Sequence, residues 1–280
     1  MAFEKNMPLF IFDWKGFFIL VAGAVLPTLA VSVLNVMWML SMGKNFQYDF
    51  FFLLVSNAVM WMGAIIAFDL FICRPETGRK LDFPMRSPGL KTYLVVFPLM
   101  FGMMLTAEFL TSQIPVTGPV FGPMYEWFSM QMEMLSSDIS VMIVLAVVMA
   151  PVFEEIVFRG IIQKGLVNNG MKSTTAIWIS AFLFGLVHFN PWQFVGAMLL
   201  GVVLGWVYEV TRSLLMPVLL HAFNNLVSTL IIVYTGTESF AEAFSVSEYI
   251  LLAIGVLMVA GFGYLLKNFN PGKQDSNNNY

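Results

Sequence analysis

Three ionisable side chains, Glu154, Glu155 and Arg159, lie within six positions of one apolar run, residues 147–160. The run otherwise has the composition of a membrane helix, where a charge at bilayer depth costs roughly 2.5–3.5 kcal/mol per residue. Ionisable groups at that depth generally mark a functional site with a polar partner nearby. The chain has only two histidines, His188 and His221, so these are the candidate partners.

The chemistry available to these side chains is hydrolysis by an activated water. A carboxylate such as Glu154 beside an imidazole such as His188 can hold and deprotonate a water molecule. His221 and Asn225 are four positions apart and share a helix face, so both could donate to a developing oxyanion. Two histidines and a glutamate are also a catalytic zinc set, so Glu154, His188 and His221 are the alternative metal ligands. No His-Glu-x-x-His stretch is present, and a metal-free site is favoured.

The two adjacent carboxylates are predicted to differ. Glu155 and Arg159 are four positions apart and can pair along the helix. Glu154 is rotated by about 100° from Glu155, so the two acids cannot face the same neighbour squarely. Pro151 removes a helix hydrogen bond and frees a carbonyl one turn back, which can widen the helix beside the acids.

Composition identifies the elements that must position these groups. Of 280 residues, 59% are hydrophobic and 11% are charged, against about 25% charged in a soluble domain, and the mean hydropathy is +0.80. The sequence therefore predicts an all-α, polytopic membrane helix bundle, with residues 1–280 as one membrane domain. The net charge of −3 and the absence of a basic run give no support for nucleic-acid binding, and one cysteine, Cys73, excludes an intrachain disulfide.

Hydropathy predicts about eight transmembrane helices. They cover residues 17–39, 50–73, 92–110, 137–163, 174–189, 192–210, 214–234 and 248–266. In the connection 111–137, three prolines and two glycines are expected to prevent a helix until residue 125, where an interfacial helix should follow. The Asn-rich tail, residues 268–280, is expected to be disordered.

Charge distribution predicts the orientation. With both termini in the cytoplasm, twelve of the fourteen Lys and Arg residues fall on the inner side, and only Lys44 falls outside. Helical rise then places Glu154, His188, His221 and Asn225 in one slab of the membrane, on three helices. We expect a polar pocket there, within a catalytic core spanning residues 135–235.

Three motifs in this core resemble those of the CAAX protease and bacteriocin-processing family of intramembrane endopeptidases. They are Glu154-Glu155-x-x-x-Arg159, Phe184-x-x-x-His188 and His221-x-x-x-Asn225, in the order that the family has them. The resemblance implies an intramembrane peptide hydrolase of the CAAX endopeptidase type.

The resemblance also implies roles. Glu154 and His188 would activate the water, His221 and Asn225 would stabilise the oxyanion, and Glu155, Arg159 and Phe184 would support the site. No cofactor is favoured and zinc is the alternative. The implied partner is a peptide or protein in or at the bilayer, with lipidated substrates included, and the implied location is a bacterial cell membrane.

Two other classes of function use similar residues. Buried Glu and His also form proton relays in transporters, but no internal repeat is present to support a transporter. A non-catalytic membrane scaffold could keep the fold without the activity. The complete set of motifs favours the hydrolase, while the substrate and the oligomeric state stay open.

Overall fold

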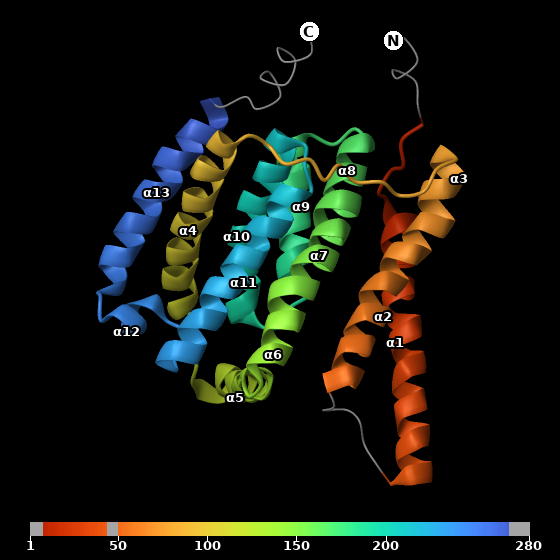
Figure 1. The fold of residues 1–280 in the computed structure, drawn as a ribbon, viewed down its shortest axis with the longest axis horizontal. Helices are drawn as coiled ribbons and strands as arrows, with labels where there is room; N and C mark the ends of the chain where they lie inside the picture. The colour runs from red at the N-terminus through yellow and green to blue at the C-terminus, as the bar shows by residue number, and fades with distance from the viewer. Residues whose placement is uncertain (1–7, 44–49, 269–280) are drawn as a thin grey trace. The chain divides into compact units, whose positions relative to one another are not determined.

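The computed structural model describes residues 8–43 and 50–268 (Figure 1). These residues form helices and connections without a strand, and seven helices are long and apolar enough to cross a membrane. They are α1 (Trp14–Met42), Phe50–Thr77, α4 (Leu90–Ser112), Ile139–Asn168, α10 (Pro191–Thr211), α11 (Leu215–Thr235) and α13 (Glu248–Asn268). The predicted span 174–189 corresponds to a shorter apolar helix, α9 (Ser173–Leu186). The prediction of an all-α membrane bundle is confirmed.

The chain folds as two compact units, each made of two segments. Unit 1 consists of Met1–Phe83 and Val152–Lys172, and unit 2 consists of Pro84–Pro151 and Ser173–Tyr280. The helix Ile139–Asn168 passes from unit 2 into unit 1 after Pro151. The predicted disordered tail lies outside the described residues, apart from Asn268, which ends α13.

In unit 1, α1 packs against α2 (Phe50–Phe68) through small residues. A Cβ atom added at Gly23 would lie 2.7 Å from the carbonyl oxygen of Gly63, so the two backbones touch there. Small residues permit this close approach, which supplies packing where lipid offers no hydrophobic driving force. The second span ends in a π-helical segment, Asp69–Cys73, and the helix continues beyond the predicted end at residue 73 as α3 (Arg74–Thr77).

The segment before α1 is hydrogen-bonded to the C-terminal end of the helix Ile139–Asn168. This end is α8 (Lys164–Asn168). The Phe12 amide donates to the Gly165 carbonyl at 3.0 Å, and the Asn168 side chain donates to the Phe10 carbonyl at 2.8 Å. Both phenylalanines are buried. A Cβ at Gly165 would lie 2.6 Å from the Phe12 Cβ, so this contact requires glycine.

Unit 2 is built around α4, which packs on both α13 and α10. At Gly255 of α13, an added Cβ would lie 2.8 Å from the Gly102 carbonyl oxygen. The apolar core beside this contact consists of buried Val96, Leu99, Met100, Val203, Leu204, Val207, Met216, Leu220 and Leu266. This core holds α4, α10 and α11 together, and α11 in turn contacts the π-helical segment Ile143–Met149.

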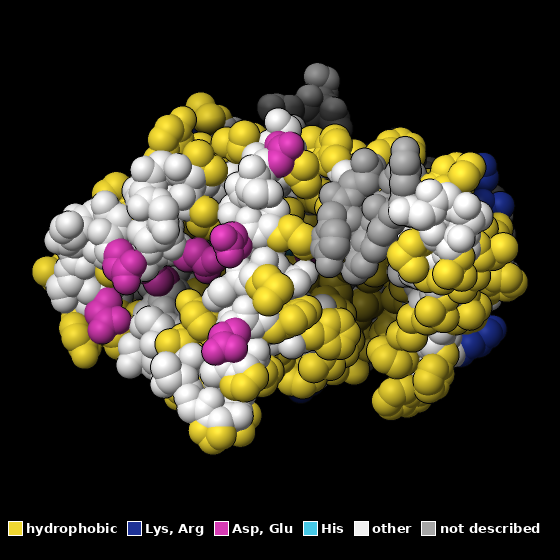
Figure 2. Space-filling view, turned by 90° about the horizontal axis from the view of Figure 1, so that it is seen from below, with side chains coloured by type: hydrophobic (Ala, Val, Ile, Leu, Met, Phe, Trp, Pro, Cys, Tyr) yellow, Lys and Arg dark blue, Asp and Glu magenta, His cyan; other side chains and the backbone are white. Residues whose placement is uncertain are grey.

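One end of unit 2 carries α5 (Gly118–Ser136) and the short helix α12 (Phe240–Phe244), and it is acidic. Figure 2, seen from below, shows Asp and Glu side chains gathered over this end. The connections 113–138 and 236–247 contain acids but no Lys or Arg. The opposite ends of α4, α10 and α13 carry Lys91, Arg212 and Lys267 (Figure 1). This separation is the one that the positive-inside rule uses, and the orientation in the membrane stays a prediction.

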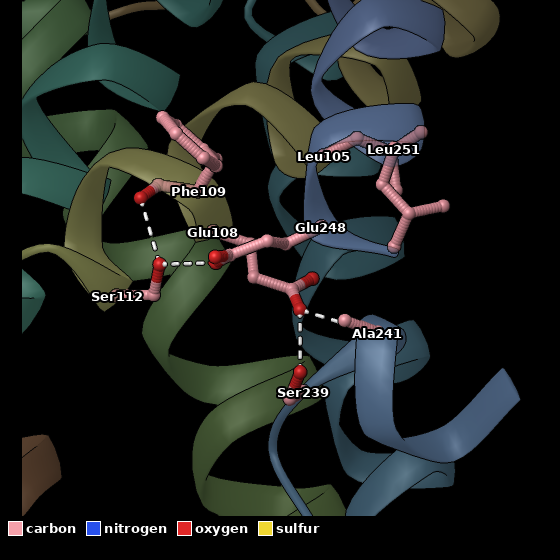
Figure 3. A pocket seen from close by; sticks show the side chains of 8 residues that line it. All are labelled: Leu105, Glu108, Phe109, Ser112, Ser239, Ala241, Glu248 and Leu251. Atoms are coloured by element: carbon pink, nitrogen blue, oxygen red, sulfur yellow. Dashed lines mark hydrogen bonds between the residues drawn. The ribbon is translucent and has the colours of Figure 1, made fainter. Parts of the chain in front are cut away.

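A small pocket at the same end contains hydrogen bonds that fix the connection 236–247 (Figure 3). The Glu108 carboxylate accepts from the Ser239 hydroxyl at 2.8 Å and from the Ala241 amide at 3.2 Å. The Ser112 hydroxyl donates to Glu248 at 3.1 Å. These bonds tie the end of α4 to α12 and to the start of α13.

The prediction that prolines delay the interfacial helix to residue 125 was wrong, because α5 already begins at Gly118. Pro119 occupies its first turn, where a missing N–H costs nothing and a fixed φ favours the helix. Pro123 is accommodated further inside the same helix. The aromatic and Met-rich part from Tyr125 is therefore the second half of a longer helix.

Candidate functional site

Glu154, Glu155 and Arg159 lie in unit 1. They form one buried ion pair and leave one more accessible carboxylate. Glu155 ends α7 (Ala150–Glu155), and Arg159 lies in the π-helical segment Ile156–Gln163 that follows. The Arg159 Nη1 donates to Glu155 Oε1 at 2.8 Å, and both side chains have no exposed surface. The predicted pairing four positions apart is confirmed, while Glu154 is only half-buried.

This arrangement distinguishes the two acids physically. In a fully buried ion pair each charge depends on the other, since removal of either partner leaves a buried charge without its counter-charge. Glu155 is therefore committed to Arg159. Glu154, which is rotated from Glu155 and keeps some exposed surface, is the carboxylate that a water or a substrate can reach.

The helix that carries the acids is widened on both sides of α7. The π-helical segments Ile143–Met149 and Ile156–Gln163 flank it, so the acids sit between two stretches with wider turns. π-Helical turns within α-helices are rare and are frequent at functional sites. Widening was predicted only at Pro151, and the π-helical segment beyond Glu155 was not predicted.

The two histidines meet in unit 2 around one aromatic ring. The ring of Phe184, on α9, contacts the His188 ring edge-to-face with centroids 5.3 Å apart. It contacts the His221 ring, on α11, in the same manner at 5.5 Å. Phe184 and His221 are buried and His188 is half-buried. The structure thus brings together His188, His221 and Phe184, and it assigns Phe184 as the ring that spaces the imidazoles.

The hydrogen bond of His188 defines its tautomer. Its Nδ1 lies 2.8 Å from the Phe184 carbonyl oxygen. A carbonyl can only accept, so the proton of the neutral ring is on Nδ1 and the lone pair is on Nε2. His188 therefore presents a basic nitrogen on the side of its ring away from Phe184's backbone.

His188 lies in a loop rather than in a helix, which corrects the predicted span 174–189. The helix α9 ends at Leu186, and the His188 amide donates to the Gly185 carbonyl in a closing turn. The next residue, Phe189, has a φ of 56°, a conformation that costs energy for a bulky side chain. Such strain persists where the surrounding structure imposes it and is often found at functional sites.

Asn190 holds this loop in place. Its side chain is buried and donates to the His188 carbonyl at 3.0 Å and to Gln193 at 2.6 Å. Its oxygen accepts from the Gln193 amide at 2.8 Å and so caps α10. An Asn-Pro pair two residues after a candidate catalytic histidine was the available signal, since Asn caps helices and Pro favours their first turn.

Asn225 lies one turn beyond His221 on α11, and its side-chain nitrogen donates to the Ala146 carbonyl at 2.7 Å. Its oxygen accepts from Asn224 at 2.8 Å. The candidate site residues are therefore divided between the units. Unit 1 contains Glu154 with the Glu155–Arg159 pair, and unit 2 contains Phe184 with the histidines and Asn225.

Comparison with known proteins identifies the segment that contains all of these residues. Residues 136–227 match the family model of the type II CAAX prenyl endopeptidases, described as Rce1-like. The match covers about a third of the chain and includes every candidate site residue from Glu154 to Asn225. No curated protein and no solved structure matches the chain. The family resemblance predicted from the three motifs is confirmed over this segment.

Proposed function

We propose that this relative of the type II CAAX prenyl endopeptidases hydrolyses a peptide bond of a membrane-associated substrate with a water activated by Glu154. The family match indicates a membrane protease of the CAAX type, and the seven apolar helices make it a multi-pass membrane protein. The observation that carries the mechanism is the contrast between the acids. Glu155 is fully buried and paired, whereas Glu154 is half-buried.

In the proposed reaction, Glu154 accepts a proton from the water while the water oxygen attacks the scissile carbonyl carbon. The Nε2 lone pair of His188 accepts a hydrogen bond from the same water and orients it. His221 and Asn225 donate to the oxyanion that forms as the carbonyl π bond breaks. Glu154 then returns its proton to the amide nitrogen as the C–N bond breaks. The products are a carboxylic acid and an amine.

Two details of unit 2 support this assignment. The bond from His188 to the Phe184 carbonyl fixes the tautomer that such a role requires. The edge-to-face contacts of Phe184 hold both imidazoles by apolar packing, which restricts their rotation without occupying a ring nitrogen. The zinc-dependent alternative would use the same two histidines with Glu154, and a chelation experiment separates the two mechanisms.

The substrate is proposed to be a peptide with its scissile bond at the membrane, and a prenylated C-terminus is the first candidate because of the family match. The protein is proposed to lie in a bacterial cell membrane with both termini in the cytoplasm.

The test uses purified protein in micelles with matched labelled peptides, one prenylated and one not. Glu154→Gln keeps the shape of the side chain and removes the base, so turnover should be abolished while the thermal unfolding midpoint stays unchanged. Glu126→Gln, on α5, is the matched control and should retain turnover. Normal turnover by Glu154→Gln would refute the proposed base.

A further inference from the structure

The carbonyl of Ala146 loses its backbone partner because of Pro151, which lies five residues later. The preceding segment Ile143–Met149 is π-helical, and at its end the Ala150 amide donates to the Leu145 carbonyl. In that register the Ala146 carbonyl would accept from the amide of residue 151. The Ala150 amide already bonds to Leu145, and Pro151 has no N–H. Neither residue 150 nor residue 151 therefore supplies the bond to the Ala146 carbonyl.

The side chain of Asn225 supplies it from another helix. Its Nδ2 donates to the Ala146 oxygen at 2.7 Å, across 79 positions of sequence. All three residues, Ala146, Pro151 and Asn225, lie in unit 2. A carbonyl that is buried without a partner is costly, most of all in a membrane, where water cannot replace the missing donor. The pairing therefore compensates for the proline.

The same bonds fix the orientation of the Asn225 amide. The Ala146 carbonyl can only accept, so the atom facing it must be the nitrogen. The oxygen of Asn225 accepts from Asn224 at 2.8 Å, which agrees with this orientation. An amide nitrogen carries two hydrogens, and only one is committed to Ala146. The second hydrogen is held in a fixed direction.

We propose that Asn225 is a positioning residue as well as an oxyanion donor. It clamps, by a hydrogen bond, the Ala146 carbonyl that Pro151 leaves without a backbone donor in the helix Ile139–Asn168. The clamp holds the turn from which Glu154 follows three residues after the proline. The stability part of this inference stands on the geometry alone. Its catalytic part rests on the proposed function, since it assigns the second hydrogen to the oxyanion.

A double-mutant cycle between Asn225 and Pro151 tests the clamp. In the full-length protein in micelles, Asn225→Ala should lower the thermal unfolding midpoint by about 2–6 °C, the effect of leaving one part-buried acceptor without its donor in a chain of this size. Pro151→Ala restores an N–H in π register with the Ala146 carbonyl. In that background Asn225→Ala should lower the midpoint by less than half as much. Equal shifts in the two backgrounds would overturn the proposal.

Two further variants keep the test decisive. Asn225→Asp has the same shape but no donor, so it should destabilise at least as much as Asn225→Ala, and Pro151→Ala should recover its yield if it folds poorly alone. Thr229→Val is the matched control, because Thr229 is buried one turn further along α11 and its hydroxyl has no hydrogen-bond partner among the described residues. Its midpoint should not fall. A loss for Thr229→Val as large as that for Asn225→Ala would assign the effect to general packing of α11.

Turnover separates the clamp from the oxyanion role. If Asn225 is also a donor, Asn225→Ala should lower kcat by about 10²–10³ with little change in KM, and Pro151→Ala should not restore it. If kcat recovers together with the midpoint, Asn225 acts through the helix alone, and the oxyanion assignment fails while the clamp stands. If kcat falls but the midpoints show no coupling, the clamp fails while the proposed function stands.

Discussion

Removal of the Arg159 guanidinium should lower the stability of the folded protein without changing the groups that react. Arg159 and Glu155 are the two sides of an ion pair at 2.8 Å, and neither side chain has any exposed surface. Arg159→Ala leaves the Glu155 carboxylate buried without this counter-charge. Breaking a buried pair in this manner costs about 3–5 kcal/mol, because the remaining charge has lost its compensation but not its desolvation.

For a chain of this size, that loss corresponds to a midpoint lower by about 6–15 °C. The assay is thermal unfolding of purified protein in micelles, together with the yield of folded protein from membranes. Arg159→Lys is the graded control, since lysine keeps the charge but loses the planar fork that suits a carboxylate. The double variant Arg159→Met with Glu155→Gln should recover most of the loss, because no buried charge remains.

The outcome that would refute this reasoning is specific. If Arg159→Ala is obtained in normal yield with an unchanged midpoint, yet shows no turnover, then Arg159 acts in the reaction. The assignment of the Glu155–Arg159 pair to structure would then be wrong. Equal instability of the double variant and of Arg159→Ala would show instead that packing, and not charge, holds this part of the helix.

Three other outcomes are expected. Exhaustive chelation should leave turnover unchanged in a peptide assay, whereas loss with chelator and return with zinc would support the metal-dependent mechanism. Asn190→Ala removes the bond to the His188 carbonyl and the cap of α10. It should lower kcat about tenfold and the thermal unfolding midpoint by about 2–4 °C. An unchanged kcat would show that the loop keeps its shape without Asn190. Reporters fused at Pro119 and Gly236 should read outside the cytoplasm and one at Gly78 inside, and an inside reading at either of the first two would contradict the predicted orientation.

The sequence was sufficient for features that depend on local pattern. Apolar length predicted the spans because a buried backbone in lipid must be helical. Spacing predicted the Glu155–Arg159 pair because residues four apart share a face. The three motifs predicted the family resemblance because their residue types and order were all present, and the match confirmed it over residues 136–227.

Features that depend on side chains outside the apolar pattern were not predicted. The end of α9 at Leu186 is not marked by a break in hydropathy, since Val187 and Phe189 continue the apolar pattern. The local signal is the Asn190-Pro191 pair, whose asparagine donates to the His188 carbonyl and caps α10. The Ala146 carbonyl before Pro151 accepts from a donor, Asn225, that lies 79 positions away. Proline predicts that a carbonyl is freed, but not which side chain will satisfy it.

The short length of α9 has a consequence for the membrane around it. Fourteen residues rise about 21 Å, while a bilayer's hydrocarbon core is about 30 Å thick. Trp178 and Leu186 on this helix are exposed, as is Phe189 after it, so this side of unit 2 offers lipid a span too short for it. Lipid can meet such a mismatch by thinning locally. Where lipid thins in this way beside α9, acyl-chain length becomes a variable that acts on the loop carrying His188.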